Sequence, residues 1–149
     1  MIGPRPTAST WTYLVHKGVE FVIDLNDEGM ERIEAQDHGL QYRGLSVPDP
    51  TEVEDLLAAF PVIDRWIEEA CGAGRKVFLH CRAGAYRSPT IAMAHMMSRG
   101  MTRGEAEATV KRAHGLTWTT GDVETLQRAL YRWENLLKAS PRKLSTQQQ

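Results

Sequence analysis

The sequence has few cysteines. Only two, Cys71 and Cys81, occur among 149 residues. A small domain held together by disulfides normally carries more, so we expect two free thiols in a reducing compartment. The first nine residues contain no basic segment followed by an apolar one, and no apolar run approaches the ~18 residues that cross a bilayer. We therefore expect a soluble, cytoplasmic protein with no membrane partner.

The charged residues also lack any clustering by sign. The formal net charge is -1, and the arginines are scattered along the chain. Without a basic run there is no electrostatic footprint for nucleic acid, so we expect no nucleic-acid partner. Metal-ligand spacing is missing around four of the five histidines, His16, His38, His95 and His114. We expect no metal, no cofactor and a monomer.

Short apolar segments alternate with segments of helical periodicity. Strands are expected at 21–25, 40–47 and 76–80, and helices at 10–17, 30–38, 51–71, 87–98, 102–113 and 122–138. This alternation predicts an α/β fold with a central, mostly parallel sheet flanked by helices. Residues 1–9 are expected to be an irregular lead-in. The chain, 1–149, is expected to be one domain with a core of about 11–138 and a flexible tail at 140–149.

One segment combines a strand, a tight loop and a helix. The apolar run Val77–Leu79 predicts a buried strand, and Cys81 begins the loop that follows it. In open α/β sheets ligands bind beyond the carboxyl ends of the strands, and a helix N-terminus suits an anion. Gly84 allows close approach of the backbone, and Arg87 offers a bidentate fork for phosphate oxygens.

The same surroundings favour a reactive thiol. A helix N-terminus and a neighbouring arginine stabilise the thiolate form of a cysteine, which is the nucleophile that a phosphomonoester requires. A cysteine and an arginine separated by five residues are a weak signal alone. The buried strand, His80, Gly84, Ser88 and the helix start make the signal specific. The sequence therefore predicts a cysteine-dependent phosphatase.

The segment His80–Ser88 reads His-Cys-Arg-Ala-Gly-Ala-Tyr-Arg-Ser. It resembles the signature of the protein tyrosine phosphatase superfamily, in its dual-specificity branch. Residues 18–25, 42–49 and 102–113 also resemble segments of that fold, and the similarity spans about 11–138. The compact layout is most similar to small atypical dual-specificity phosphatases.

The resemblance implies a role for each residue of the site. Cys81 attacks phosphorus and becomes phosphocysteine, and Arg87 binds the phosphate oxygens. Ser88 donates to the Cys81 sulfur, and His80 orders the loop and favours the thiolate. Asp49 protonates the leaving oxygen and then activates water. The substrate phosphate-binding loop comprises Arg82, Ala83, Gly84, Ala85, Tyr86 and Arg87.

Several assignments remain open at this stage. Asp55 is a second candidate for the acid, although it belongs to the expected first turn of a helix. Tyr86 stands where the family often has a small or polar residue, and its orientation is undetermined. Trp118 is interpreted as a core residue, with a contact at the rim of the site as the alternative. A disulfide between Cys71 and Cys81 is a minor possibility.

Three alternatives to a protein phosphatase share these motifs. The substrate could be a phosphoinositide or an RNA 5′-phosphate, although Ala85 and the even charge balance give little support for either. A rhodanese-like sulfur transferase also carries a cysteine loop after a strand, but its usual loop is one residue shorter. A phosphate-recognising binding module is disfavoured because the cysteine, the arginine and an acid are all present.

Overall fold

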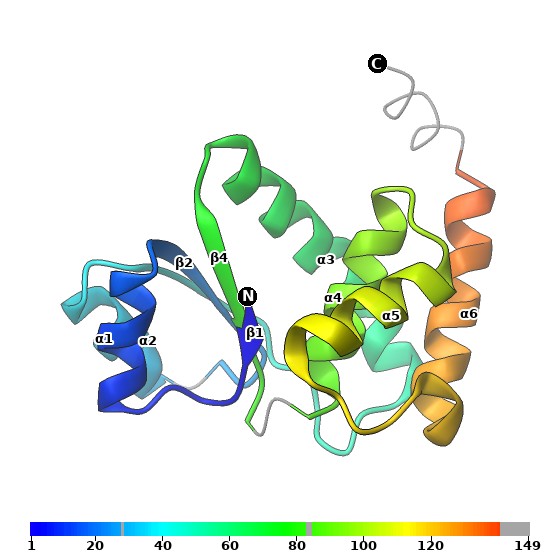
Figure 1. Ribbon diagram of the computed structural model, residues 1–149, viewed down its shortest axis with the longest axis horizontal. Coiled ribbons are helices and arrows are strands. Elements are labelled where there is room, and N and C mark those ends of the chain that lie inside the picture. Colours follow the sequence, from blue (N-terminus) through cyan, green and yellow to red (C-terminus); the bar gives the residue numbers. More distant parts are fainter. Residues whose placement is uncertain (28, 83–84, 141–149) are drawn as a thin grey trace.

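The structure, a computed structural model, describes residues 1–27, 29–82 and 85–140. Its described part forms a four-stranded sheet with helices on both faces (Figure 1). The strands are β1 (Ile2–Gly3), β2 (Val19–Asp24), β3 (Gln41–Gly44) and β4 (Lys76–His80). The helices are α1 (Ala8–His16), α2 (Gly29–Asp37), α3 (Val53–Gly72), α4 (Arg87–Ser98), α5 (Arg103–His114) and α6 (Glu124–Lys138), with a short 3-10 helix, η1 (Thr120–Asp122), before α6.

The strands are ordered β1-β4-β2-β3, and every neighbouring pair is parallel. Asp24, at the end of β2, lies opposite His80 of β4 on one side and Gly44 of β3 on the other. Three strands therefore end at the same level. The ladder continues past β3, because the Val47 N–H donates to the Leu25 carbonyl at 2.8 Å. The chain beyond Val47 consequently begins at the carboxyl edge of the sheet.

Each face of the sheet has its own apolar core. Val22 and Phe78 point to the face covered by α1 and α2, where they pack with Trp11 and Leu14. The alternate positions, such as Ile23 of β2 and Leu79 of β4, point to the face covered by α3, α4, α5 and α6. Strands buried on both faces explain the continuous apolar runs seen in the sequence. Successive residues of β4 therefore serve opposite sides of the molecule.

The α/β class and the parallel sheet are confirmed, and the bounds of β4 and α4 are those predicted. The prediction that residues 1–9 are irregular was wrong in part, because Ile2–Gly3 is a strand and α1 already begins at Ala8. β1 pairs with Leu79 and His80, and the Met1 amino group donates to the Val77 carbonyl at 3.0 Å. Two residues carry no periodicity, so only the partner strand defines this element. Strand β3 is also shorter than expected, and α3 runs through Pro61.

Within the described residues, no helix combines the length and the apolarity that crossing a membrane requires.

Trp133 joins helix α6 to helices α3 and α4. Its ring lies 5.5 Å from that of Phe60 in α3, and its Nε1–H donates to the Ala94 carbonyl of α4 at 3.0 Å. Replacing this buried indole leaves a cavity and removes a hydrogen bond between α6 and α4. α6 therefore stabilises the helix that follows the signature loop.

We predict that Trp133→Ala lowers the free energy of unfolding by about 3–5 kcal/mol, because a large buried aromatic side chain is removed. Equilibrium unfolding in urea measures the change. Leu136→Ala is the matched control: it lies in the same helix with its side chain 55% exposed, and should change stability by no more than about 0.5 kcal/mol. Equal midpoints for Trp133→Ala and the unsubstituted protein would contradict this packing role.

Candidate active site

Cys81 directly follows β4 and is buried at the carboxyl edge of the sheet. Its Sγ lies 3.4 Å from the Oγ of Ser88, which is fully buried in the first turn of α4. A helix N-terminus presents free N–H groups and a partial positive charge to this position. The Ser88 hydroxyl can donate a hydrogen bond to the Cys81 sulfur.

Arg87 connects α4 to the segment that follows β3. Its side chain is only 5% exposed, and its Nη1 donates to the Val47 carbonyl at 2.6 Å. Its Nη2 lies 3.7 Å from the Asp49 Oδ2. The hydrogen bond to the Val47 carbonyl holds the guanidinium in a defined position beside the cysteine loop. Asp49 lies on the outer side of the guanidinium.

Asp49 and Cys81 line the same pocket, which has a volume of about 340 Å³. Arg87 and Tyr86 contribute to its walls, and Leu126 of α6 closes one side. The Asp49 side chain is 68% exposed, so its carboxyl group is open to a ligand in the pocket. The structure thus brings a thiol, a guanidinium and a carboxyl group together around one space.

Asp55, the other candidate for the acid, has a local structural role. Its Oδ2 accepts a hydrogen bond at 2.9 Å from the Glu52 N–H, and the two residues form a capping box at the start of α3. A carboxylate engaged in this way satisfies a helix N-terminal donor and interacts favourably with the helix dipole. The geometry therefore favours Asp49 as the carboxyl group available to a substrate.

Residues distant in the chain form hydrogen bonds to the described parts of the signature loop. The Arg82 carbonyl accepts from the Arg5 N–H at 3.0 Å, and the Ala85 carbonyl accepts from the Trp118 Nε1–H at 2.8 Å. Ala83 and Gly84, which belong to the expected phosphate-binding loop, lie outside the described residues. Backbone groups on both sides of these two residues are thus fixed by distant parts of the chain.

Tyr86 lines the pocket and contacts the ring of Trp118. Their ring centroids lie 5.3 Å apart, and Tyr86 is exposed while lining the pocket. Trp118 is half-buried against the larger core, as its interpretation as a core residue predicted, and a contact with substrate at the rim stays a prediction. Its hydrogen bond to the loop was not anticipated, because nothing in the sequence relates the indole to a carbonyl 33 residues away.

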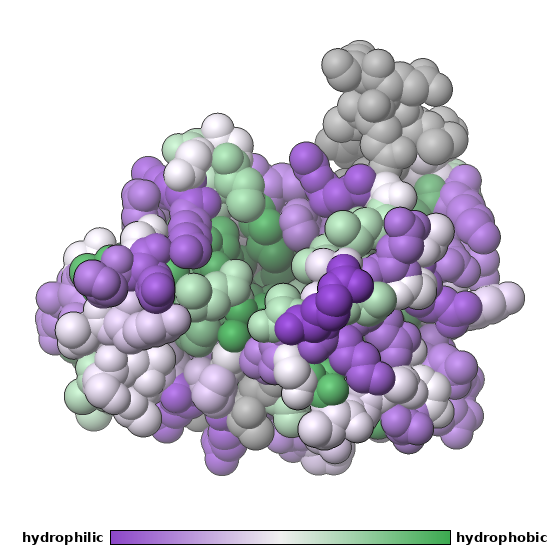
Figure 2. Space-filling view, viewed as in Figure 1, coloured by the Kyte–Doolittle hydropathy of each residue, from purple (hydrophilic) through white to green (hydrophobic). Residues whose placement is uncertain are grey.

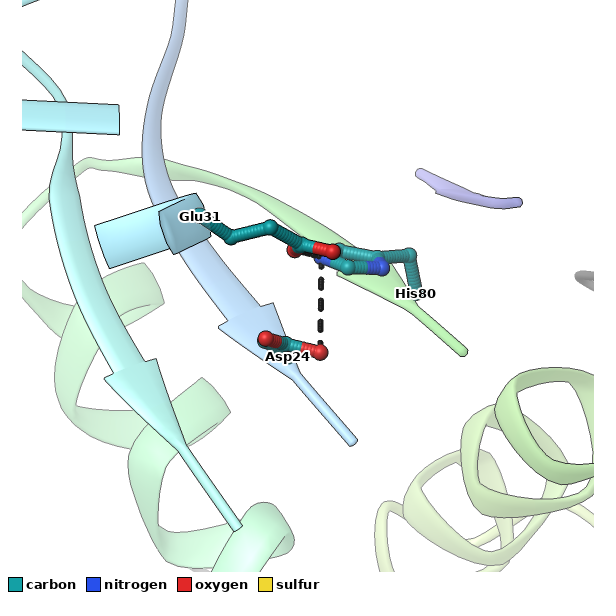
Figure 3. A group of neighbouring side chains, drawn as sticks. All are labelled: Asp24, Glu31 and His80. Carbon is teal, nitrogen blue, oxygen red and sulfur yellow. Dashed lines mark ion pairs between the residues drawn. The ribbon is translucent and has the colours of Figure 1, made fainter. Parts of the chain in front are cut away.

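His80 lies on the other face of the sheet from the Cys81 thiol, in a fully buried group with Asp24 and Glu31 (Figure 3). Its Nε2 lies 2.7 Å from the Glu31 Oε2 and 3.8 Å from the Asp24 Oδ1. Its Nδ1 lies 3.4 Å from the Cys81 carbonyl oxygen. Sequence reasoning identified His80 but missed both carboxylates.

The buried carboxylates affect the groups around them. The Tyr42 hydroxyl donates to the Asp24 Oδ2 at 2.6 Å, and burial together with this hydrogen bond raises the pKa of Tyr42. Burial also raises the pKa of Glu31, and the hydrogen-bonding contact with His80 opposes that rise. The three side chains Asp24, Glu31 and His80 are, among the described residues, the group whose spacing could hold a metal ion.

Cys71 lies far from this site. It is exposed and borders a hollow of about 500 Å³ beside Lys76 and Val77, at the start of β4. Apolar side chains gather in the hollow between the sheet and the α3–α5 helices (Figure 2). Cys81 follows the other end of the five-residue strand, about 16 Å along it. Because a disulfide needs Cα atoms within about 7 Å, Cys71 and Cys81 cannot form one without rearrangement.

Comparison with known proteins agrees with this geometry. Residues 1–135 match the family model described as "Dual specificity phosphatase, catalytic domain". The chain belongs to this family. Its enzyme class is therefore that of phosphoric monoester hydrolases, and the resemblance inferred from the signature is confirmed. The sulfur-transferase alternative is set aside.

Individual relatives differ in how much of the chain they cover. The dual specificity protein phosphatase Mpk3 of Drosophila melanogaster is 41% identical over 59 residues, which span 39% of this chain but only 14% of that protein. A crystal structure of a mutant form of Tk-PTP is 31% identical, covers 93% of this chain and 91% of its own, and has a TM-score of 0.72. A mouse putative dual specificity phosphatase, complexed with zinc tungstate, has a TM-score of 0.75 at 23% identity, covering 93% and 83% of the two chains.

We predict that Trp118→Phe lowers kcat/KM for an aryl phosphate about fivefold, because a hydrogen bond worth about 1 kcal/mol to the loop is lost while an aromatic ring remains. Steady-state kinetics with para-nitrophenyl phosphate measures this. The control is Trp66→Phe, which removes an indole of α3 that contacts Arg43, away from the loop. A fivefold loss in both variants would argue against a specific role of the Ala85 contact.

Proposed function

We propose that this protein is a cysteine-dependent protein phosphatase that hydrolyses phosphotyrosine, and phosphoserine or phosphothreonine, through a phosphocysteine intermediate on Cys81. We further propose that the chain acts as a single catalytic domain. The observation that supports this most directly is the pocket shared by Cys81, Arg87 and Asp49. A nucleophile, a cation for the phosphate and a proton donor are the groups that a two-step displacement needs.

In the first step the Cys81 sulfur attacks phosphorus, and the bond from phosphorus to the leaving oxygen breaks. Arg87 lies beside the nucleophile and would bind the equatorial oxygens, because a guanidinium matches phosphate with two parallel hydrogen bonds. Asp49, at the open side of the pocket, would give its proton to the leaving oxygen. Backbone N–H groups of the signature loop would bind the remaining phosphate oxygens.

In the second step water attacks the phosphocysteine. Asp49, now ionised, would take a proton from that water, and the Cys81 sulfur would leave as a thiolate. The Ser88 hydroxyl, 3.4 Å from the sulfur, would stabilise the departing negative charge by donating a hydrogen bond. The cycle ends with inorganic phosphate and the free thiolate.

The walls of the pocket favour an aryl phosphate. Pro50, Tyr86 and Leu126 present apolar surface around the position of the thiol. The phenyl ring of phosphotyrosine would bury its area against these side chains, whereas a shorter phosphoserine would leave them uncovered. This supports phosphotyrosine as the preferred substrate.

A polar hollow beside the pocket supports a second candidate class of substrate. This hollow, of about 280 Å³, is lined by Asn26, Ser46 and Arg82 and shares Asp49 and Arg87 with the first pocket. A substrate with two phosphates, such as a phosphoinositide, would place the second one there. Comparing kcat/KM for a phosphotyrosine peptide and for a soluble inositol bisphosphate distinguishes the two classes, and Arg82→Ala should affect only the second.

We predict that Cys81→Ser and Arg87→Ala abolish turnover of para-nitrophenyl phosphate in the presence of EDTA. Asp49→Ala should lower kcat about 10²–10⁴-fold for a phosphotyrosine peptide, because its leaving group needs a proton. The loss should be smaller for para-nitrophenyl phosphate, whose leaving group is stable as an anion. Rates for the two substrates with each variant test these assignments.

Asp55→Ala is the matched control for the acid. It removes a carboxylate that caps α3 and should cost stability, about 1 kcal/mol, but not turnover. If Asp55→Ala showed the dependence on the leaving group and Asp49→Ala did not, the assignment of the acid would be wrong.

A further inference from the structure

The group formed by Asp24, Glu31 and His80 is buried behind the nucleophile, where the proposed reaction does not use it directly. All three side chains are fully buried, and they come from β2, α2 and β4 (Figure 3). Burying ionisable groups is costly unless each is paired. The group lies at the base of the cysteine loop, because His80 directly precedes Cys81 and contacts its carbonyl.

Both ring nitrogens of His80 face oxygen atoms. Nδ1 lies 3.4 Å from the Cys81 carbonyl oxygen, which can only accept, so the proton belongs on Nδ1. Nε2 lies 2.7 Å from the Glu31 Oε2, although the contact is less linear than an ideal hydrogen bond. The Glu31 carboxylate therefore lies against the ring nitrogen that does not face the Cys81 carbonyl, and the two contacts together fix the orientation of the ring.

Asp24 anchors this arrangement from the other side. Its Oδ1 accepts from the Asn26 N–H at 2.8 Å, and its Oδ2 accepts from the Tyr42 hydroxyl at 2.6 Å. The carboxylate is thus fixed, with Oδ1 3.8 Å from the His80 Nε2. Burial, and to a lesser extent the charge of Asp24, raise the pKa of Glu31.

The surroundings disfavour a metal ion in this group. The Arg5 Nε lies 3.1 Å from the Glu31 Oε1 and already supplies a cation to that carboxylate. A divalent ion held by Glu31 and His80 would be repelled by this guanidinium.

The same Arg5 joins the group to the signature loop. Its backbone N–H donates to the Arg82 carbonyl at 3.0 Å, while its side chain pairs with Glu31. His80 reaches the preceding carbonyl, that of Cys81. The first two carbonyls of the loop are thus held from the α2 side of the sheet. Because a peptide unit is planar and trans, a Cys81 carbonyl directed toward His80 turns the Arg82 N–H the opposite way.

We propose that Glu31 is a positioning residue for the reaction: it holds the His80 ring so that Nδ1–H binds the Cys81 carbonyl, which orients the nucleophile and the first N–H of the phosphate-binding loop. Asp24 and Arg5 support Glu31 in this role. The proposal rests on the proposed function, in which Cys81 is the nucleophile.

The protonation of the His80 ring is the first test. Long-range ¹H–¹⁵N correlation spectra of ¹⁵N-histidine-labelled protein near neutral pH report which ring nitrogens carry protons, and a His80→Asn sample identifies the signal. We expect a proton on Nδ1 in the unsubstituted protein. An unprotonated Nδ1 would overturn the proposal, as would a change of the His80 signals on adding EDTA, which would indicate a metal site.

Variants of Glu31 provide the second test, in a Cys71→Ser background because Cys71 is an exposed thiol. Glu31→Ala should lower kcat about 100-fold, the scale of a small misplacement of reacting groups, with less effect on KM. The Nδ1–H of its His80 should also lose the hydrogen bond to the Cys81 carbonyl, which moves the Nδ1 proton signal upfield. Glu31→Gln can still contact the ring, so it should keep this hydrogen bond and lose less activity. If Glu31→Ala does not fold, Glu31→Gln and the unsubstituted protein still decide the question.

Glu34→Gln is the matched control in the same helix. The Glu34 Oε2 accepts from the Trp11 Nε1–H at 2.7 Å, so this carboxyl group is directed toward α1 rather than toward His80, and kcat should be unchanged. Equal losses in Glu34→Gln and Glu31→Gln would show that only the stability of α2 matters, and would overturn the proposal. Thermal unfolding of each variant ensures that all rates are taken on folded protein.

The rate of alkylation of Cys81 by iodoacetate separates the two claims, because it needs no phosphatase activity. If alkylation slows in Glu31→Ala but even the unsubstituted protein shows no turnover that depends on Cys81, the proposed function fails and the positioning role stands. If turnover depends on Cys81 and neither turnover nor alkylation changes in Glu31→Ala, the positioning role fails and the proposed function stands.

Discussion

The parallel register of β4, β2 and β3 is the constraint on which the site depends. Because Asp24 lies level with both His80 and Gly44, the three strands end together, and the segments that follow them meet at one edge of the sheet. One of these segments carries Cys81 and the other leads to Asp49. Two groups 32 positions apart in the chain can then line one pocket. Arg87 secures the arrangement by donating to the Val47 carbonyl, which belongs to the segment after β3.

Because side chains alternate along β4, Cys81 and His80 lie on opposite faces of the sheet. The Cys81 thiol lies on the side of α4, near Ser88 and the helix N-terminus. His80 lies on the side of α1 and α2, with Asp24 and Glu31. The Cys81 thiol can therefore face the pocket on one side of the sheet, while its backbone is held from the other side by buried ionisable groups. A catalytic histidine–cysteine dyad is incompatible with this geometry.

The features that could be predicted from the sequence are those that depend on a few consecutive residues. The apolar run of β4, the helix start at Arg87 and the capping box of Thr102 and Glu105 are each contained within a few residues, and the structure shows all three. The α/β class followed from their alternation. Local pattern did not define β1, because two residues have no periodicity of their own and only the edge of β4 makes them a strand.

The residues missed near the site have a common physical reason. Helix α2 exposes Met30 and Ile33, at 63% and 56%, while it buries Glu31. Periodicity therefore points to the wrong face of this helix, and a buried acid is recognised only when its partner, His80, is placed beside it. The contacts of Arg87 with Val47 and of Trp118 with Ala85 likewise join residues that are distant in the chain. No local signal could have found them.

The most direct test of the account is to trap the covalent intermediate. Asp49→Ala, which should slow the second step, is mixed with a good aryl phosphate, quenched in acid within one turnover, and digested for mass spectrometry. The account predicts one phosphoryl group on the peptide that carries Cys81, and none in Cys81→Ser. Turnover with no phosphate on that peptide, or with phosphate on another residue, would contradict it.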